Sequence, residues 1–398
     1  MPIKRTRSVR HVAVLIESSL GYGRGLLEGI ARYSREQGNW VLYFELRGLE
    51  PFPLWMRDWK GDGILVSFPS WQVTPALLAK RVPVVDLNGS LTPYGLPQVD
   101  TDNTAVARLA LEHFWERGIR HFGFCGLPRG DWPLMDQRGE AFAGQVKAAG
   151  CSCSLFAWPA RHQAGTDWKQ EVEEIAAWLT ELPKPVGVLA YFDDRGYQVL
   201  NACRRAGLTV PEEVAVLGVS NDVLLCGMCL PPLSSIDLNA EQIGYVAAAY
   251  LDRRMRGGAP LRSPQIIPPR GVVPRRSTDV LATDDADLAA ALRFIRDHAC
   301  DGIRVDDVLR EVAISQRALE RKCRAFLGRT PKAELLRVQM TRASELLTDS
   351  DLPIKEVAQR CGFHNKEIYF SNAFYRQYGV WPTAYRRRSR HSGSLVDG

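Results

Sequence analysis

Polar side chains able to hold a polyol follow several short apolar runs in the first two thirds of the chain. Carboxylate, amide and guanidinium groups each offer more than one hydrogen-bonding atom, so they can bind adjacent hydroxyls of a ligand. Aromatic rings at the same positions can cover the C–H face of such a molecule. In open parallel sheets, ligands bind beyond the carboxyl ends of the strands. The candidate ligand-binding residues are Ser18, Tyr22, Arg24, Trp132, Arg138, Asp193, Arg195, Ser220, Asn221 and Asp222.

Several of these candidates also have a purely structural interpretation. Arg138 could pair with Asp136 or Asp131 as an ordinary surface bridge. Asp193 and Asp194 could simply cap the helix predicted from Arg195, because aspartate is common at that position. Trp132 could be a rim or core aromatic residue. Both interpretations stay open at the level of the sequence.

A second set of residues comes from a repeat near the C-terminus. The pattern of residues 308–331 returns at 357–382, with two residues added in the turn of the second copy. Each copy predicts a short apolar-periodic helix, a small residue at a bend, and a second helix ended by Gly and Pro. This is the plan of a helix-turn-helix, so the sequence predicts two such units.

The exposed faces of these units are basic. From Ser315 to Arg390 there are 16 Lys+Arg and 7 Asp+Glu, a net charge of +9, whereas the whole chain carries +6. Such a concentration favours binding to phosphates, although a helical interaction domain with a solvated charged face is the alternative. Arg and Lys can read guanine, Asn and Gln adenine, and Glu cytosine. The candidate DNA-binding residues are Gln316, Arg317, Arg321, Arg324, Asn365, Lys366, Glu367, Ser371, Asn372, Arg376 and Arg387.

The candidate ligand-binding residues and the candidate DNA-binding residues lie in parts of the chain with different predicted folds. From His11, short β-rich runs alternate with amphipathic helices, which predicts parallel sheets covered by helices on both faces. The run is too long for one sheet, so we expect two lobes, with a crossing near Asp100–Asp102 and a return near Ser235–Leu238. An all-α domain with two helix-turn-helix units follows. The expected parts are a basic arm (1–10), a two-lobed ligand-sensing domain (11–277), a linker (278–287), a DNA-binding domain (288–390, with helix-turn-helix units at about 305–328 and 353–379) and a tail (391–398).

The length and composition of the chain limit the number of domains and the classes of protein to which it can belong. The 398 residues suffice for two or three domains, and no apolar run is long enough to span a membrane. The nine cysteines are scattered, and Cys226-x-x-Cys229 lacks the second pair of ligands that a zinc site requires. We therefore expect a cytoplasmic protein with reduced thiols, no bound metal and no cofactor.

An enzyme is the alternative to a binding protein. The segment Gly21-Tyr22-Gly23-Arg24-Gly25 imitates a dinucleotide fingerprint, but Leu26 stands where the third glycine is needed. No Walker A sequence, paired histidine ligands or Gly-x-Ser-x-Gly motif occurs. We expect no enzyme, and the alternative is a nucleotide-dependent enzyme domain fused to a DNA-binding domain.

The C-terminal motifs resemble the AraC-type double helix-turn-helix family. The resemblance implies that the second helix of each unit lies in a major groove, with the helix between the units spanning about one turn of DNA, roughly 34 Å. Cys323 departs from the family pattern, which has Phe there, and leaves that small core less filled. The motifs are Gly362-Phe363, Phe370-Ser371-x-x-Phe374, Gly379-x-x-Pro382-x-x-Tyr385-Arg386, and, in the first unit, Ser315-x-x-x-Leu319 and Gly328-x-x-Pro331.

The preceding region resembles the sugar-sensing core of the LacI/GalR family, which has a periplasmic-binding-protein-like fold. Those repressors carry their DNA reader at the N-terminus, so the order here is like that of xylose-responsive regulators. This resemblance implies a transcription activator with a double-stranded DNA operator, a small sugar effector (a pentose such as xylose), RNA polymerase as a partner and a homodimer. The motifs are Tyr22-Gly23-Arg24-Gly25, Val99-Asp100-Thr101-Asp102-Asn103, Val210-Pro211-Glu212-Glu213-Val214 and Arg275-Arg276-Ser277-Thr278.

Ser220 departs from the sugar-sensing pattern. Relatives with this sensor have Asp before Asn221, so a carboxylate that accepts from two hydroxyls is replaced by a single hydroxyl. Either Asp222 supplies the missing carboxylate or the ligand differs from a xylose-like pentose.

Overall fold

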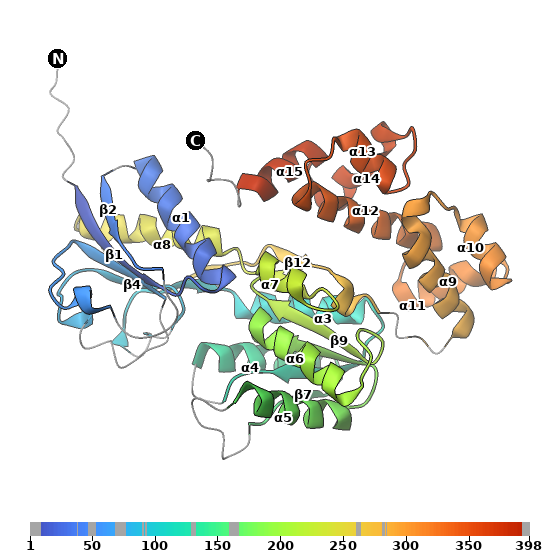
Figure 1. Ribbon diagram of the computed structural model, residues 1–398, viewed down its shortest axis with the longest axis horizontal. Coiled ribbons are helices and arrows are strands. Elements are labelled where there is room, and N and C mark those ends of the chain that lie inside the picture. Colours follow the sequence, from blue (N-terminus) through green and yellow to red (C-terminus); the bar gives the residue numbers. More distant parts are fainter. Residues whose placement is uncertain are drawn as a thin grey trace. The chain divides into compact units, whose positions relative to one another are not determined.

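The chain forms two compact units, and the division between them falls after Val280 in the computed structural model (Figure 1). The structure describes residues 9–37, 39–46, 53–67, 77–89, 91, 94–128, 133–158, 167–259, 264–280, 283 and 285–391.

The first unit alternates strands and helices, as the sequence predicts. The strands are β1 (Arg10–Ile16), β2 (Trp40–Tyr43), β3 (Gly63–Ser67), β4 (Val84–Asp86), β5 (Val99–Thr101), β6 (His121–Cys125), β7 (Cys153–Leu155), β8 (Val186–Ala190), β9 (Val214–Val219), β10 (Ser234–Asp237), β11 (Gln265–Ile267) and β12 (Gly271–Val273). The helices are α1 (Gly21–Gln37), α3 (Asn103–Trp115), α4 (Pro133–Ala148), α5 (Trp168–Glu181), α6 (Asp193–Ala206), α7 (Val223–Met228) and α8 (Ala240–Met255), with 3-10 turns η1 (Leu54–Met56) and η4 (Arg276–Thr278).

Two sheets build two lobes. The first has the order β2-β1-β3-β4 and its paired strands are parallel. The second has the order β12-β10-β9-β8-β6-β7, in which β12 is antiparallel to β10 and the other pairs are parallel. The predicted two-lobed α/β fold is therefore confirmed.

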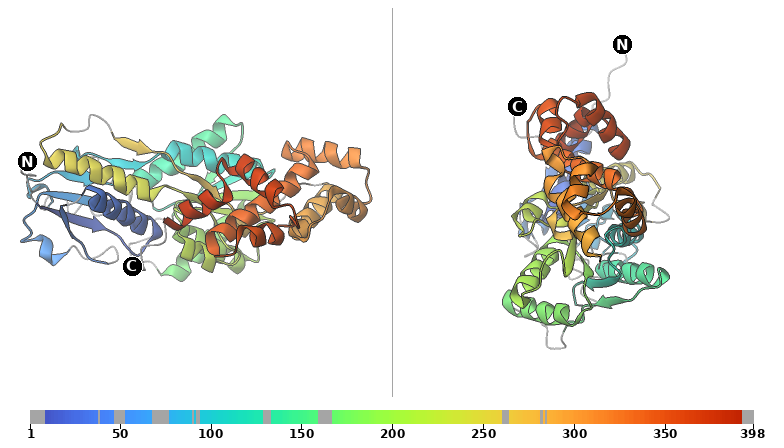
Figure 2. Two further views of the ribbon diagram at one scale, coloured as in Figure 1. Left: turned by 90° about the horizontal axis from the view of Figure 1, so that it is seen from above. Right: turned by 90° about the vertical axis from the view of Figure 1, so that its right-hand side faces the viewer.

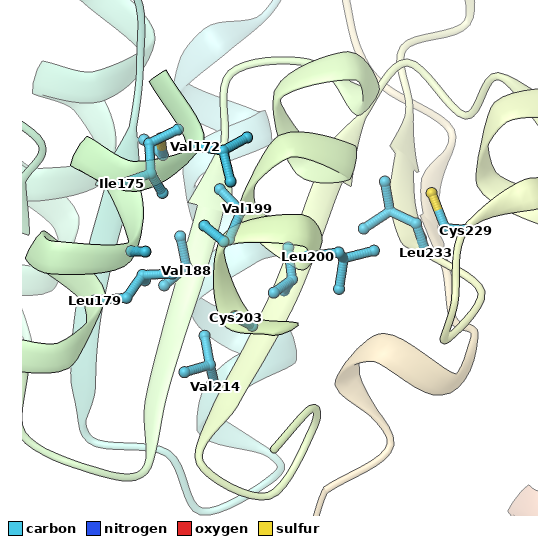
Figure 3. Packing of buried hydrophobic residues seen from close by; sticks show 14 of the residues in the cluster. Val172, Ile175, Leu179, Val188, Val199, Leu200, Cys203, Val214, Cys229 and Leu233 are labelled. Atoms are coloured by element: carbon cyan, nitrogen blue, oxygen red, sulfur yellow. The ribbon is translucent and has the colours of Figure 1, made fainter. Parts of the chain in front are cut away.

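Helices cover both faces of the second sheet, because alternate residues of a strand point to opposite faces. On β6, the Phe122 ring contacts Phe114 of α3 and Phe142 of α4. A side chain at the next residue, Gly123, would instead meet Trp178 of α5. Figure 3 shows the core on the α5 and α6 face, where Val188 and its neighbours are almost completely buried.

The chain passes between the lobes at the predicted places. Strand β5 follows the first lobe and precedes α3, and β11 pairs with it in a separate two-stranded parallel sheet. After β10 the chain returns to the first lobe, because α8 packs against α1 and β3. The chain passes between the lobes a third time from β11, which pairs with β5, to β12, which pairs with β10. These connections let one lobe rotate against the other, as in hinge closure around a ligand.

Helices α1 and α8 pack unusually closely, although 200 residues separate them. Figure 2 shows them side by side in blue and yellow. A Cβ atom at Gly29 would lie 1.9 Å from the Glu241 carbonyl oxygen, and one at Gly244 would lie 2.1 Å from that of Leu26. Only glycine permits this approach of two backbones.

Replacing Gly244 with alanine should therefore destabilise the first unit. The new methyl group must push two helix backbones apart, which costs roughly 1–3 kcal/mol. Thermal unfolding should show a melting temperature lower by several degrees. The control is Gly227→Ala in α7, where nothing lies within 4 Å of the new Cβ atom. Equal melting temperatures for both variants would contradict the close packing of α1 and α8.

The second unit is all helical among its described residues. Its elements are α9 (Ala286–His298), η5 (Ala299–Asp301), α10 (Val305–Val312), α11 (Gln316–Leu327), α12 (Pro331–Asp349), α13 (Ile354–Arg360), α14 (Glu367–Tyr378) and α15 (Pro382–His391). Two small cores share α12: Leu335 belongs to the core of the first repeat, whereas Met340, Ala343 and Leu347 belong to that of the second.

The two turns between the repeated helices differ in length. Residues 313–315 separate α10 from α11, whereas residues 361–366 separate α13 from α14. The turns contain left-handed backbone at Ala313 in the first copy and at Gly362 and Asn365 in the second. The longer second turn agrees with the residues added in the sequence repeat.

Some elements differ from the sequence prediction. The β-rich runs at 40–46 and 186–192 would each suit a longer strand, but β2 ends at Tyr43 and β8 ends at Ala190. The short helix α7 and the three-residue strands β11 and β12 were not predicted, because such short elements have no periodicity. No helix of the described ranges has the length and apolar character to cross a membrane.

Candidate functional site

A cavity of about 90 Å³ opens in the first unit. This is several times the volume that one water molecule requires, roughly 10–15 Å³. Its wall comes from both lobes, and it includes the carboxyl end of β3 and the residues that follow β4 and β8. The lining residues are Glu17, Leu20, Tyr22, Gly23, Ser67, Asn88, Asp100, Thr101, Arg138, Tyr191, Phe192, Asp194 and Leu238.

Arg138 is the only cation among the described residues of this lining, and it is 1% exposed. Its Nε donates to Asn103 Oδ1 at 2.9 Å, and its Nη1 donates to the Tyr191 carbonyl oxygen. Burial lowers the pKa of the guanidinium to about 10, so the group stays charged at neutral pH. Arg138 therefore faces the cavity and is not the surface bridge that was its structural alternative.

Aromatic rings form an apolar wall beside this cation. The Arg138 guanidinium lies 5.1 Å from the centre of the Phe192 ring. The Tyr22 ring lies 5.9 Å from Phe192, and the Tyr22 hydroxyl donates to the Leu87 carbonyl oxygen at 3.2 Å. The cavity thus offers an apolar face together with charged and polar groups, which suits a ligand with both hydroxyls and C–H groups.

Three buried oxygen atoms of the lining have no hydrogen-bond partner among the described residues. They are Glu17 Oε2, Thr101 Oγ1 and Asp194 Oδ1. Buried polar atoms are almost always hydrogen-bonded in folded proteins, to protein groups or to water. These oxygens belong to residues of the cavity lining.

Asp100 adds a carboxyl group from the strand that connects the lobes. Burial raises its pKa to about 7, although it accepts from the Thr101 amide at 2.6 Å and from Gln98 Nε2 at 3.1 Å. A carboxyl group near its titration point can accept from a ligand hydroxyl when ionised and donate to one when protonated.

Several predicted ligand-binding residues do not line the cavity and bind other residues of the protein instead. Asp193 accepts from Ser235 Oγ at 2.5 Å, from Ser220 Oγ at 3.0 Å and from the Asp222 amide at 2.7 Å, and burial raises its pKa to about 7. Asp193 therefore holds the loop after β9 and is not an N-cap of α6. Arg195 pairs with Glu171 at 3.2 Å, so it too is absent from the cavity lining.

The loop after β9 ties the two lobes together. Asp222 Oδ2 accepts from the Gly21 amide at 2.7 Å and from Arg24 Nη2 at 2.8 Å, both on α1. This carboxylate occupies the helix N-terminus at which a dinucleotide pyrophosphate would bind. Asp222 therefore does not replace the carboxylate lost at Ser220.

The remaining predicted ligand residues also have internal partners or lie outside the described part. Asn221 Oδ1 accepts from Arg275 Nη2 at 2.8 Å, and the Ser18 carbonyl oxygen accepts from Arg24 Nη1 at 3.2 Å. Trp132 lies outside the described residues.

Most of the lining residues were not among the ligand-binding residues predicted from the sequence, although their positions near strand ends could have indicated them. Ser67 and Asn88 stand at or just after strand ends, as Tyr191, Phe192 and Asp194 do. Adjacent residues of a helix point about 100° apart. The sequence alone therefore could not show which of Asp193 and Asp194 lines the cavity.

The second unit presents its first basic helix as expected. Ser315 caps α11, because its Oγ accepts from the Ala318 amide at 3.3 Å. Leu319 and Cys323 face inward, and Phe326 is half-buried. On the opposite face, the side chain of Gln316 donates to Glu320 at 3.1 Å. The predicted contact residues of this helix are all exposed: Gln316, Arg317, Arg321 and Arg324.

The second unit presents α14 in a similar way. Phe370 and Phe374 are fully buried, as predicted. Arg386 of α15 donates to the Leu352 carbonyl oxygen at 2.6 Å and so fixes the structure of this unit. Of the predicted contact residues, Asn365, Lys366, Asn372, Arg376 and Arg387 are exposed, and Glu367 and Ser371 are half-buried. Asn365 and Lys366 belong to the turn before α14 and not to the helix itself.

Three family comparisons agree with these two sites. Residues 11–104 match the XylR N-terminal domain, residues 111–278 match the periplasmic binding protein-like domain, and residues 308–388 match a helix-turn-helix domain. A periplasmic-binding-protein-like sensor followed by a helix-turn-helix domain defines the class of sugar-responsive DNA-binding transcription regulators.

Individual relatives define the group more closely. The xylose operon regulatory protein of Escherichia coli K12 is 32% identical over 390 residues, which cover 95% of this chain and 97% of that protein. That of Haemophilus influenzae is 28% identical over 389 residues, covering 96% and 99%. The structure of the xylose-binding transcription activator XylR superposes with a TM-score of 0.65 at 30% identity, covering 96% of this chain and 99% of that one. The chain belongs to the family of xylose operon regulatory proteins. These relatives are regulators, and they do not favour the alternative of a nucleotide-dependent enzyme.

Proposed function

We propose that the cavity binds a pentose such as xylose and that its occupancy controls DNA binding by the second unit. The single observation that carries this proposal is a cavity whose lining combines the Arg138 guanidinium and the Asp100 carboxyl group with the Tyr22 and Phe192 rings. The names of the relatives, which are xylose operon regulators and a xylose-binding activator, support the same ligand.

The proposed binding mode follows from the chemistry of the lining. Asp194, Glu17 and Asp100 accept from sugar hydroxyls, and Arg138 donates to sugar oxygens. The Tyr22 and Phe192 rings cover the C–H face. Asp194 takes over the role of the carboxylate that Ser220 lacks, because Asp194 belongs to the cavity lining whereas Ser220 bonds to Asp193.

The second part of the proposal concerns the partners. The protein acts in the cytoplasm as a homodimer on a double-stranded operator, contacts RNA polymerase as an activator, and performs no catalysis. The ligand shifts the two lobes between open and closed arrangements, which changes how two sensor domains pair and how their DNA readers are spaced. The Asp222 contacts to α1 join the lobes and so respond to this movement.

Ligand binding can be tested by thermal unfolding of the full-length protein with pentoses, hexoses and sugar acids. Xylose should raise the melting temperature of the first unit by mass action, because at 100 times the Kd it adds about 2.7 kcal/mol to the free energy of unfolding. A response to hexoses or sugar acids but not to pentoses would reject the proposed ligand. No response to any sugar would reject the sugar site.

DNA binding can be tested by two variants of the second unit. Lys366→Ala should weaken binding at particular base pairs, because the side chain lies next to the start of α14. Arg387→Ala should weaken binding to every DNA sequence, as expected for the loss of a phosphate contact. It should also reduce the slope of log affinity against log salt concentration by about one. Salt titrations on selected and random duplexes separate these effects. Equal losses on both duplexes for both variants would contradict the assignment.

A further inference from the structure

The face of α14 that we assign to DNA carries a large apolar side chain in its first turn. Ile368 is 81% exposed, the highest value among the large hydrophobic side chains of the described residues. Single exposed apolar side chains are common on protein surfaces, so exposure alone has no functional meaning. The position of Ile368 among predicted DNA-contacting residues is what distinguishes it.

The burial pattern of α14 places Ile368 on its outer face. Phe370, Ala373 and Phe374 point into the core, and these positions define the inner stripe of the helix. Ile368 and Asn372 are four residues apart and both are exposed, so they are neighbours on the opposite stripe. An element that places Asn372 in the major groove must place Ile368 there as well.

Tyr369, the residue next to Ile368, is anchored to the core of the second repeat. Its ring lies 6.0 Å from that of Phe363, which is buried in the core of the second repeat. Lys366 precedes the helix and is exposed. The apolar side chain is thus flanked by an anchored aromatic ring and by groups that suit base edges and phosphates.

The major groove offers one apolar group to such a side chain, the C5-methyl of thymine. We propose that Ile368 reads a thymine methyl and is a specificity-determining residue of the second helix-turn-helix unit. This inference rests on the proposed DNA binding and extends it to a base type.

The first helix-turn-helix unit carries no such exposed apolar side chain on its second helix. The exposed residues of α11 are Gln316, three arginines and Ala325, with no large apolar side chain among them. Arginine in the major groove favours guanine. The two helix-turn-helix units should therefore read DNA subsites of different base composition. We expect α11 to contact guanine and the start of α14 to contact thymine.

The test uses duplexes selected from a random pool by the full-length protein. Each thymine of the selected site is replaced in turn by deoxyuridine, which removes only the methyl group. For the unaltered protein, the replacement at one or two thymines should weaken binding about fourfold, the factor equivalent to ~0.8 kcal/mol for one buried methyl group. Ile368→Ala should fold normally and bind the thymine and uridine duplexes equally. The matched control, Asn372→Ala, should lose affinity but keep the fourfold preference for thymine.

The possible outcomes are distinct. Failure of the unaltered protein to select any duplex would reject the proposed DNA binding itself. Selection of a site without sensitivity to any thymine methyl would overturn the role of Ile368 alone. A preference for thymine that survives in Ile368→Ala would assign the contact to another residue and would also overturn it.

Discussion

Replacing Arg138 with methionine should weaken xylose binding roughly 100-fold or more. The guanidinium is buried in the cavity lining, where hydrogen bonds from a charged donor contribute most. Asn103 and the Tyr191 carbonyl oxygen fix its orientation, so it is preorganised for the ligand. Isothermal titration of the full-length variant with xylose measures the loss directly.

The same change should leave the fold intact. Methionine is flexible and fills much of the same space, and the loss of the donor to Asn103 Oδ1 and to the Tyr191 carbonyl oxygen should lower stability by roughly 1–3 kcal/mol for each without unfolding the unit. The matched control is Arg108→Met on α3, which removes an exposed surface pair with Glu112 and should leave xylose affinity unchanged. An Arg138→Met protein that is folded and binds xylose as tightly as the control would contradict the proposed binding mode.

Replacing Glu334 with glutamine should destabilise the second unit by on the order of 3 kcal/mol. Glu334 is 4% exposed and accepts from Arg329 Nε at 2.6 Å and from Arg337 Nη2 at 2.7 Å. Burial alone would raise the pKa of this carboxyl, but the two arginines outweigh that effect and lower it to about 2. A shift from the ordinary value near 4.5 to about 2 is equivalent to roughly 3 kcal/mol.

The pH dependence of this contribution has a definite sign. Because the pKa is lower in the folded protein, the stabilisation is complete above about pH 4.5 and is lost as the pH falls toward 2. Denaturant unfolding between pH 7 and pH 3 should therefore show a steeper loss of stability for the unaltered protein than for Glu334→Gln. The control is Glu356→Gln, whose exposed pair with Arg360 should contribute at most about 0.5 kcal/mol. Identical pH profiles for all three proteins would contradict the account.

Much of the fold follows from patterns that are local in the sequence. Buried strands such as β8 and β9 appear as continuous apolar runs, and α1 and α8 as long amphipathic helices. The close approach of α1 to α8 could not be predicted, because the glycines that allow it lie more than 200 residues apart. Strand β5 was recognised only as a crossing, because three residues are too few to show alternation.

The candidate cavity was harder to predict than the fold. Tyr22 and Arg138 were identified because both combine hydrogen-bonding groups with positions near strand ends. Asp193 and Asp194 are adjacent, and only the Ser235 and Ser220 hydroxyls that bind Asp193 show which of the two faces the cavity. Those partners lie 27 and 42 residues away, beyond the reach of any local pattern.

The most direct test of the account is the affinity of the full-length protein for its selected duplex with and without saturating xylose. We expect xylose to change the Kd by a factor of about 5–150, the usual range for coupling between two sites. Arg138→Met should show the same DNA affinity at both xylose concentrations. An unaltered protein that binds xylose, yet has the same DNA affinity and footprint with and without it, would contradict the claim that the cavity controls the DNA reader.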